Sequence, residues 1–176
     1  MTNSKFRIYN LEFSDGFTFI EIILYVSIVS IVLAALVPVA WNVIGGSAKS
    51  SAQQEVFSQT RFISEKIKYE IRNADSINSV AATSLSLDPP GTANDPTIID
   101  LSGGKLRIKL GAASAVDLNS TDTTITSLTF TDYTSADTKT KHVQFVFTID
   151  DNFGSTRQEY DVPAQTIEGS AELRSN

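Results

Sequence analysis

The sequence predicts an α+β protein in which one long N-terminal helix packs against an antiparallel β-sheet head. Two observations lead to this fold class. From Phe17 to Ile44 the chain is apolar and carries a single charged side chain, Glu21. From residue 77 onward, short segments alternate apolar and polar residues between clusters of Asp, Asn, Gly and Pro, as half-buried strands do. A helix followed by a separate run of strands is typical of α+β proteins.

Residues 17–46 are predicted to form a helix that crosses a membrane. The hydrocarbon core of a bilayer is about 30 Å thick and needs about 20 mainly apolar residues. Lys5 and Arg7 precede the apolar run, and positive charge there favours a cytoplasmic N-terminus. We therefore expect a single-pass protein of the cytoplasmic (inner) membrane with an extracytoplasmic head. Pro38 has no amide hydrogen and predicts a kink in this helix.

Residues 47–76 are predicted to continue the helix as an amphipathic half that packs on the head and ends near Ala74. Phe57, Phe62 and Tyr69 lie off its apolar stripe, where they either widen the buried face or contact another chain. The stripe residues recur at helical spacing: Ala48, Ala52, Val56, Ile63, Ile67, Ile71 and Ala74.

Residues 77–176 are predicted to form the antiparallel head, with one sheet face covered by the helix. Ser102-Gly103-Gly104 joins two strands as a hairpin, and a phase slip between Ile125 and Leu128 predicts a bulge. The tail from Ala164 is expected to end as a short strand or a frayed segment. The expected strands are 84–87, 97–101, 105–110, 123–131, 143–149 and 156–162.

Composition argues against several kinds of functional site. The formal net charge of −6 is unsuited to nucleic acid, because phosphate contacts need a basic patch. The chain has no Cys and one His, His142, which leaves no thiolate nucleophile, His-based triad or multi-histidine metal site. We expect no enzymatic activity and no cofactor.

Calcium is the one metal for which the sequence offers oxygen ligands. Asp150 and Asp151 are the best local candidates, and Asp132, Asp137 and Asp161 are further carboxylates of the head. EF-hand spacing is absent, however, and Asp is a common turn residue. No metal site is therefore expected.

The residues Gly16-Phe17-Thr18-Phe19-Ile20-Glu21, followed by an unbroken apolar helix, resemble the N-terminal signature of type IV pilins and the related pseudopilins. The resemblance covers residues 16–41, and Pro38 matches a proline common in these helices. Ser14-Asp15 stands beside Gly16, where many leaders of the family carry a basic residue. The resemblance implies a pilin-like fold and a minor pilin or minor pseudopilin of a type IV pilus, type II secretion or DNA-uptake system.

By the same resemblance, residues 1–16 are a leader that prepilin peptidase removes by cutting after Gly16. The new N-terminal amine of Phe17 is then methylated, and Glu21 sets the register between subunits. Residues 17–46 serve first as a membrane anchor and later as the core of a surface or periplasmic filament. The implied partners are prepilin peptidase, other pilin or pseudopilin subunits, an inner-membrane assembly platform and the lipid bilayer.

Two other functions remain compatible with the residues. One is a signal-anchored extracytoplasmic binding module that acts without filament assembly, in which Glu21 is hydrated at the membrane interface. The other is an anchored hydrolase, against which the missing catalytic constellations argue.

Overall fold

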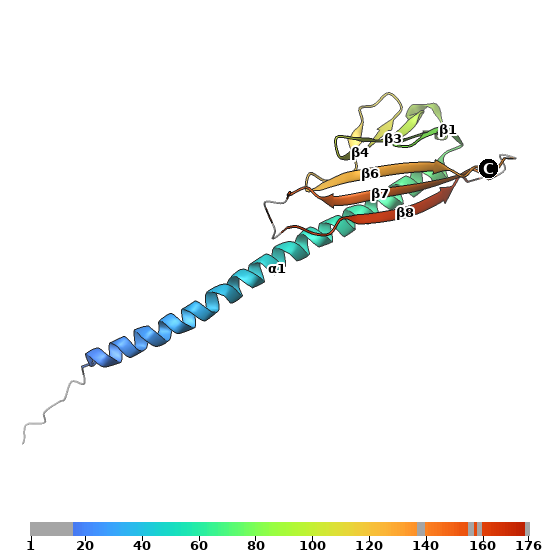
Figure 1. The fold of residues 1–176 in the computed structure, drawn as a ribbon. Helices are drawn as coiled ribbons and strands as arrows, with labels where there is room; N and C mark the ends of the chain where they lie inside the picture. The colour runs from blue at the N-terminus through green and yellow to red at the C-terminus, as the bar shows by residue number, and fades with distance from the viewer. Residues whose placement is uncertain (1–15, 137–139, 155–156, 158–159, 175–176) are drawn as a thin grey trace, which may run out of the picture. The chain divides into compact units, whose positions relative to one another are not determined.

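The computed structural model describes residues 16–136, 140–154, 157 and 160–174. It has one long helix followed by antiparallel sheets, as predicted (Figure 1). The chain forms two compact units, one up to Val43 and one from Ile44. The elements are α1 (Phe19–Asn73), β1 (Ser76–Ala81), β2 (Ser84–Asp88), a short 3₁₀ helix (Thr92–Asn94), β3 (Thr97–Ser102), β4 (Lys105–Leu110), β5 (Val116–Asp117), β6 (Thr123–Asp132), β7 (His142–Asp151) and β8 (Gln165–Glu172).

The strands form two sheets, whereas the sequence led us to expect one. Strands β1 to β5 make an antiparallel sheet in chain order, and β6, β7 and β8 make a second one. Single backbone hydrogen bonds join β6 to the turns of the first sheet. The amide of Ile125 donates to the Gly104 carbonyl and that of Phe130 to the Ala82 carbonyl, each at 2.9 Å. Isolated bonds of this kind do not make a continuous ladder, so the sheets remain separate.

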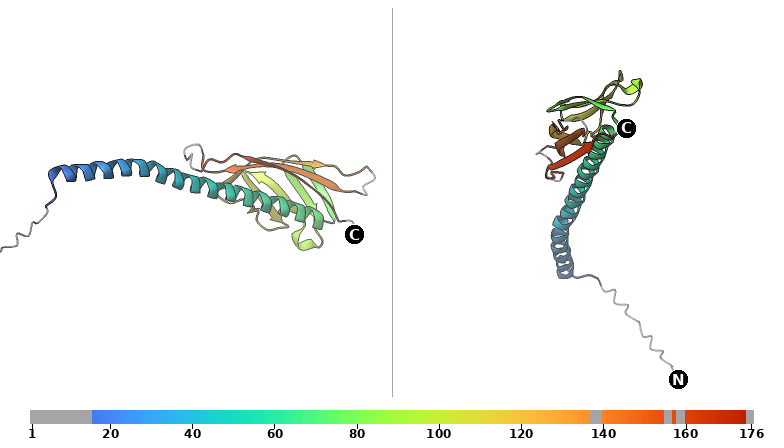
Figure 2. Two further views of the ribbon diagram at one scale, coloured as in Figure 1. Left: turned by 90° about the horizontal axis from the view of Figure 1, so that it is seen from below. Right: turned by 90° about the vertical axis from the view of Figure 1, so that its right-hand side faces the viewer.

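The C-terminal half of α1 buries its predicted apolar stripe from Ala52 onward in the core of the second unit, whereas Ala48 is only half-buried. Figures 1 and 2 show this half of the helix alongside β6, β7 and β8. Thr60 is also buried, and its hydroxyl donates to the Val56 carbonyl at 2.7 Å, so that its polar atom is satisfied inside the core. The buried stripe residues are Ala52, Val56, Ile63, Ile67, Ile71 and Ala74.

The strands that alternate most regularly in sequence are in place. In β4, Leu106 and Ile108 are buried while Lys105, Arg107 and Lys109 are not. In β7 the predicted residues Val143, Phe145, Phe147 and Ile149 are fully buried. The pairing of β6 with β7 shifts between Ile125 and Ser127, which confirms the predicted bulge.

The strand expected at 156–162 is wrong. The described residues of that range, Arg157 and 160–162, lie outside any strand, and β7 pairs instead with β6 and β8. Tyr160 and Val162 produced the apolar alternation, but they have other roles. The Tyr160 ring lies 4.7 Å from that of Phe153, and the buried Val162 donates its amide to Asp151 Oδ2 at 3.2 Å. Tyr160 and Val162 therefore pack on the core outside either sheet.

Candidate functional site at the start of the long helix

Gly16 and Phe17 lie in irregular, exposed backbone immediately before α1. The Phe17 side chain is 73% exposed, and a Cβ added at Gly16 would meet no atom within 4 Å. The peptide bond between them is therefore accessible and outside the helical hydrogen-bond ladder. Exposed segments outside regular secondary structure are preferred sites of proteolytic cleavage.

Thr18 caps the helix and determines where it begins. The Glu21 amide donates to Thr18 Oγ1 at 3.3 Å and to the Thr18 carbonyl at 3.1 Å. The same carbonyl accepts a hydrogen bond from the Ile22 amide at 3.2 Å. A Thr followed three residues later by Glu has the sequence of a capping box. The cap satisfies amides that would otherwise lack partners at a helix start. It also keeps the Gly16–Phe17 bond outside the helix.

Glu21 has a side-chain partner that the sequence analysis did not identify. The Tyr25 hydroxyl donates to Glu21 Oε1 at 3.1 Å. The Tyr25 ring also contacts Phe17 edge to face, with ring centroids 6.3 Å apart and an interplanar angle of 75°. A tyrosine four residues after a glutamate lies on the same face of a helix, and this spacing was the signal available in the sequence. Phe17, Glu21 and Tyr25 thus form one contact cluster.

Beyond this cluster, the N-terminal half of α1 is exposed and apolar. Every large apolar side chain from Phe17 to Ile44 is at least 47% exposed. The hydroxyls of Ser27 and Ser30 donate to the carbonyls of Ile23 and Val26, each at 2.7 Å. Lipid offers no hydrogen-bond partners, so polar groups on a spanning helix must be satisfied within the protein. By length and composition α1 can cross a membrane.

Pro38 lies inside α1, and residues on both sides of it are helical. The stretch 19–44, at about 1.5 Å per residue, is roughly 39 Å long, against a hydrocarbon core of about 30 Å. The helix therefore has the length to span the core with Pro38 included. The kink expected at Pro38 stays a prediction.

The two leading calcium candidates, Asp150 and Asp151, end β7, and their carboxylates accept backbone amides. Asp150 Oδ1 accepts the amide of Asp151 at 2.9 Å, and the Asp151 carboxylate accepts amides from Phe153 and Val162. Burial raises the pKa of Asp150; the hydrogen bond from the Asp151 amide lowers it, and the charges of Asp151 and Asp161 raise it. Within the described ranges, no three His, Cys, Asp or Glu side chains are placed to hold a metal. Asp137 lies outside these ranges.

His142 begins β7, where its ring lies 6.4 Å from that of Tyr133 in an edge-to-face contact. It is half-buried. No carboxylate hydrogen bond or ion pair involves it in the part of the chain that the structure describes. The orienting carboxylate of a Ser-His-Asp arrangement is therefore not among its described contacts.

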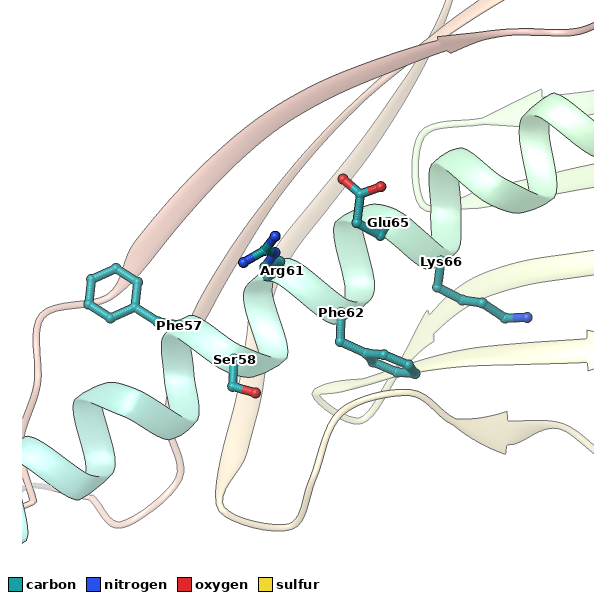
Figure 3. Close-up of a pocket in the computed structure, with 6 residues that line it drawn as sticks. All are labelled: Phe57, Ser58, Arg61, Phe62, Glu65 and Lys66. Carbon is teal, nitrogen blue, oxygen red and sulfur yellow. The ribbon is translucent and has the colours of Figure 1, made fainter.

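A shallow surface hollow lies on the C-terminal half of α1 (Figure 3). In this view Arg61 and Glu65 project from one side of the helix, and Phe62 projects from the other. Phe57, Phe62 and Tyr69 are 49%, 52% and 58% exposed, so these aromatics do not widen the buried face. The hollow is lined by Phe57, Ser58, Arg61, Phe62, Glu65 and Lys66.

Three comparisons with known proteins find no protein similar to this chain. A scan against protein-family models finds no match, and neither a curated protein nor a solved structure matches the chain significantly.

Proposed function

We propose that this protein is a structural subunit, a minor pilin or pseudopilin, of a type IV pilus, type II secretion or DNA-uptake filament. Prepilin peptidase cuts the bond between Gly16 and Phe17 and methylates the new amine. The subunit then enters the filament through the N-terminal half of α1. Before assembly the same half anchors the subunit in the inner membrane, with its head on the extracytoplasmic side.

The observation that carries this proposal is the junction at Gly16 and Phe17. An exposed, non-helical bond stands directly before a capped helix. Glu21 lies in the first turn of that helix. All large apolar side chains in the following stretch are exposed. An accessible bond before an apolar helix suits a peptidase that removes a leader and leaves the anchor in the membrane.

Glu21 supports the proposal electrostatically. A lone carboxylate on a membrane helix is unfavourable, by about 2.5–3.5 kcal/mol at the bilayer centre on insertion scales. Cutting after Gly16 creates an amine on Phe17 that is positive near neutral pH. Pairing this amine with Glu21 of a neighbouring subunit would compensate the carboxylate at a single axial stagger.

Co-expression with a prepilin peptidase tests the proposal. We expect the protein to lose residues 1–16, to begin at Phe17 and to carry one added methyl group, as measured by intact mass and N-terminal sequencing. Gly16→Leu should block the cut, whereas the same change at Gly46 should not. Both glycines lie in open space, so neither substitution disturbs packing.

A full-length product would contradict the proposal and favour the signal-anchored binding module. A cut beyond the apolar run would also contradict it, because the helix would then be lost from the mature protein.

A further inference from the structure

We propose that Tyr25 is the positioning residue for Glu21. Its hydroxyl donates a hydrogen bond to one carboxylate oxygen of Glu21, and its ring contacts the ring of Phe17. The carboxylate and the residue that will carry the new amine are thereby kept beside the same tyrosine at the start of the helix before assembly. This inference rests on the proposed function, in which Glu21 meets the Phe17 amine of a neighbouring subunit.

The geometry assigns the role to Tyr25 specifically. Glu21 and Tyr25 are four residues apart on one face of α1. Phe17 lies just before the helix and reaches the same tyrosine through its ring. Tyr25 makes both contacts, the 3.1 Å hydrogen bond to Glu21 Oε1 and the edge-to-face contact with Phe17. Within the described part of the chain, no other side chain donates to the Glu21 carboxylate.

Spacing alone does not produce this contact. Glu65 and Tyr69 stand on the same helix with the same four-residue separation. There, Glu65 pairs with Lys68 at 3.2 Å, and the Tyr69 ring lies 5.3 Å from the Lys66 ammonium. In the apolar half of α1 no lysine or arginine competes for the carboxylate. The tyrosine hydroxyl is the donor that remains.

The hydrogen bond leaves Glu21 able to accept a second partner. A carboxylate has two oxygens and about four lone-pair positions, and Tyr25 uses one position on Oε1. Oε2 stays available for an incoming amine. Tyr25 therefore does not compete with that amine. It fixes the direction from which the amine must approach, as supporting hydrogen bonds do for functional groups in general.

The contact is tested on the full chain in detergent micelles by NMR, with tyrosine labelled with ¹³C at Cζ. Tyr25→Phe identifies the Tyr25 resonance by its absence. Glu21→Val should move that resonance, because the phenol loses its acceptor. Glu65→Val is the matched control and should leave it unmoved. If the chemical shift of the Tyr25 resonance does not change in Glu21→Val, the positioning role is overturned.

Filament incorporation tests the consequence in cells that carry the assembly system. Tyr25→Phe keeps the ring and loses the hydroxyl, so cleavage after Gly16 should stay normal while incorporation falls. We expect a decrease of at least about tenfold, because hydrogen bonds to charged groups are among the stronger ones in proteins. In a Glu21→Val background, Tyr25→Phe should cause no further loss.

The outcomes separate this inference from the proposed function. Undiminished incorporation of Tyr25→Phe, or an equal further loss in the Glu21→Val background, would overturn the role of Tyr25 while leaving the pilin proposal intact. Failure of the peptidase to cut the unmodified chain would overturn the proposed function, and the positioning role with it.

Discussion

Gly169 in β8 shows how closely a single residue can be fitted to the core. A Cβ added there would lie 2.3 Å from Cζ of Phe145. Gly169 and Phe145 are register partners in neighbouring strands, and the Phe145 ring is fully buried. The phenyl ring therefore fills the space that a side chain at residue 169 would need.

We predict that Gly169→Ala destabilises the head by about 1–3 kcal/mol, the usual cost of overpacking a well-filled core. The measurement is thermal unfolding of the full chain in detergent, followed by near-ultraviolet circular dichroism. Ser170→Ala, at the exposed neighbouring position, is the control and should have little effect. Equal melting of both variants would mean that Phe145 moves aside freely.

Asn119 is a second residue whose role depends on the fold. It is buried, and its Oδ1 accepts the Leu106 amide at 2.9 Å. Its amide group donates to the carbonyls of Thr123 and Gly104, at 2.8 and 3.3 Å. Two of these partners, Leu106 and Gly104, lie 13 and 15 residues away in the chain, so nothing in the local sequence distinguishes this Asn from a turn residue. The contact of Tyr25 with Glu21 was not predicted for a related reason, because many pairs of residues in a helix are four positions apart and most of them make no such contact.

At the scale of elements, the C-terminal half of α1 has one face buried in the core and another exposed to solvent. Ile67 on the stripe is fully buried, whereas Phe62 is 52% exposed. Both are large apolar residues in the same turns of the same helix. Their different environments follow from the direction in which each side chain leaves the helix axis.

We therefore predict a large difference between two truncations. Ile67→Ala should lower the free energy of unfolding by about 2–5 kcal/mol, because it leaves a cavity in the core. Phe62→Ala should change it by no more than about 0.5 kcal/mol, as is usual at exposed positions. Urea unfolding of both variants measures the difference. A comparable loss for Phe62→Ala would show that this aromatic is covered in the free protein.

The elements that sequence reasoning located are those whose periodicity is complete. β4 and β7 alternate without interruption, and the stripe of α1 recurs over many turns. β1 and β8 were missed or left uncertain because their sequences, Ser-Ile-Asn-Ser-Val-Ala and Gln-Thr-Ile-Glu-Gly-Ser-Ala-Glu, carry few apolar residues. Their positions are determined by pairing with the preceding or following strand, β1 with β2 and β8 with β7. The division into two sheets was not predicted, because the alternation within a strand does not show where a sheet ends.

At the scale of the whole molecule, the hydrophobic core belongs to one unit. Its buried apolar residues begin at Ala52, and the large apolar residues up to Ile44 are exposed. Folding of the head and placement in a membrane therefore depend on separate parts of the sequence. The candidate site could be located from the sequence because its residues are contiguous, while the contacts of Tyr25 required the structure.

We predict that a fragment of residues 44–176 unfolds cooperatively in water without detergent, because it retains the whole core. In phase separation with Triton X-114, the full chain should enter the detergent-rich phase and the fragment the aqueous phase. Circular dichroism on heating checks the cooperativity of the fragment. An aggregated or non-cooperative fragment would show that the head needs the preceding helix to fold.

The internally bonded hydroxyls of Ser27 and Ser30 have a mechanical consequence. Because both donate to their own helix, residues 26–39 present an almost uniform hydrocarbon surface to any neighbour. Two such surfaces can pack against each other along their length, but they offer no charged or hydrogen-bonding pair that selects one axial position. In the filament that we propose, that selection would come from the end that carries Glu21 and Tyr25. Cohesion and alignment would then be divided between different stretches of one helix.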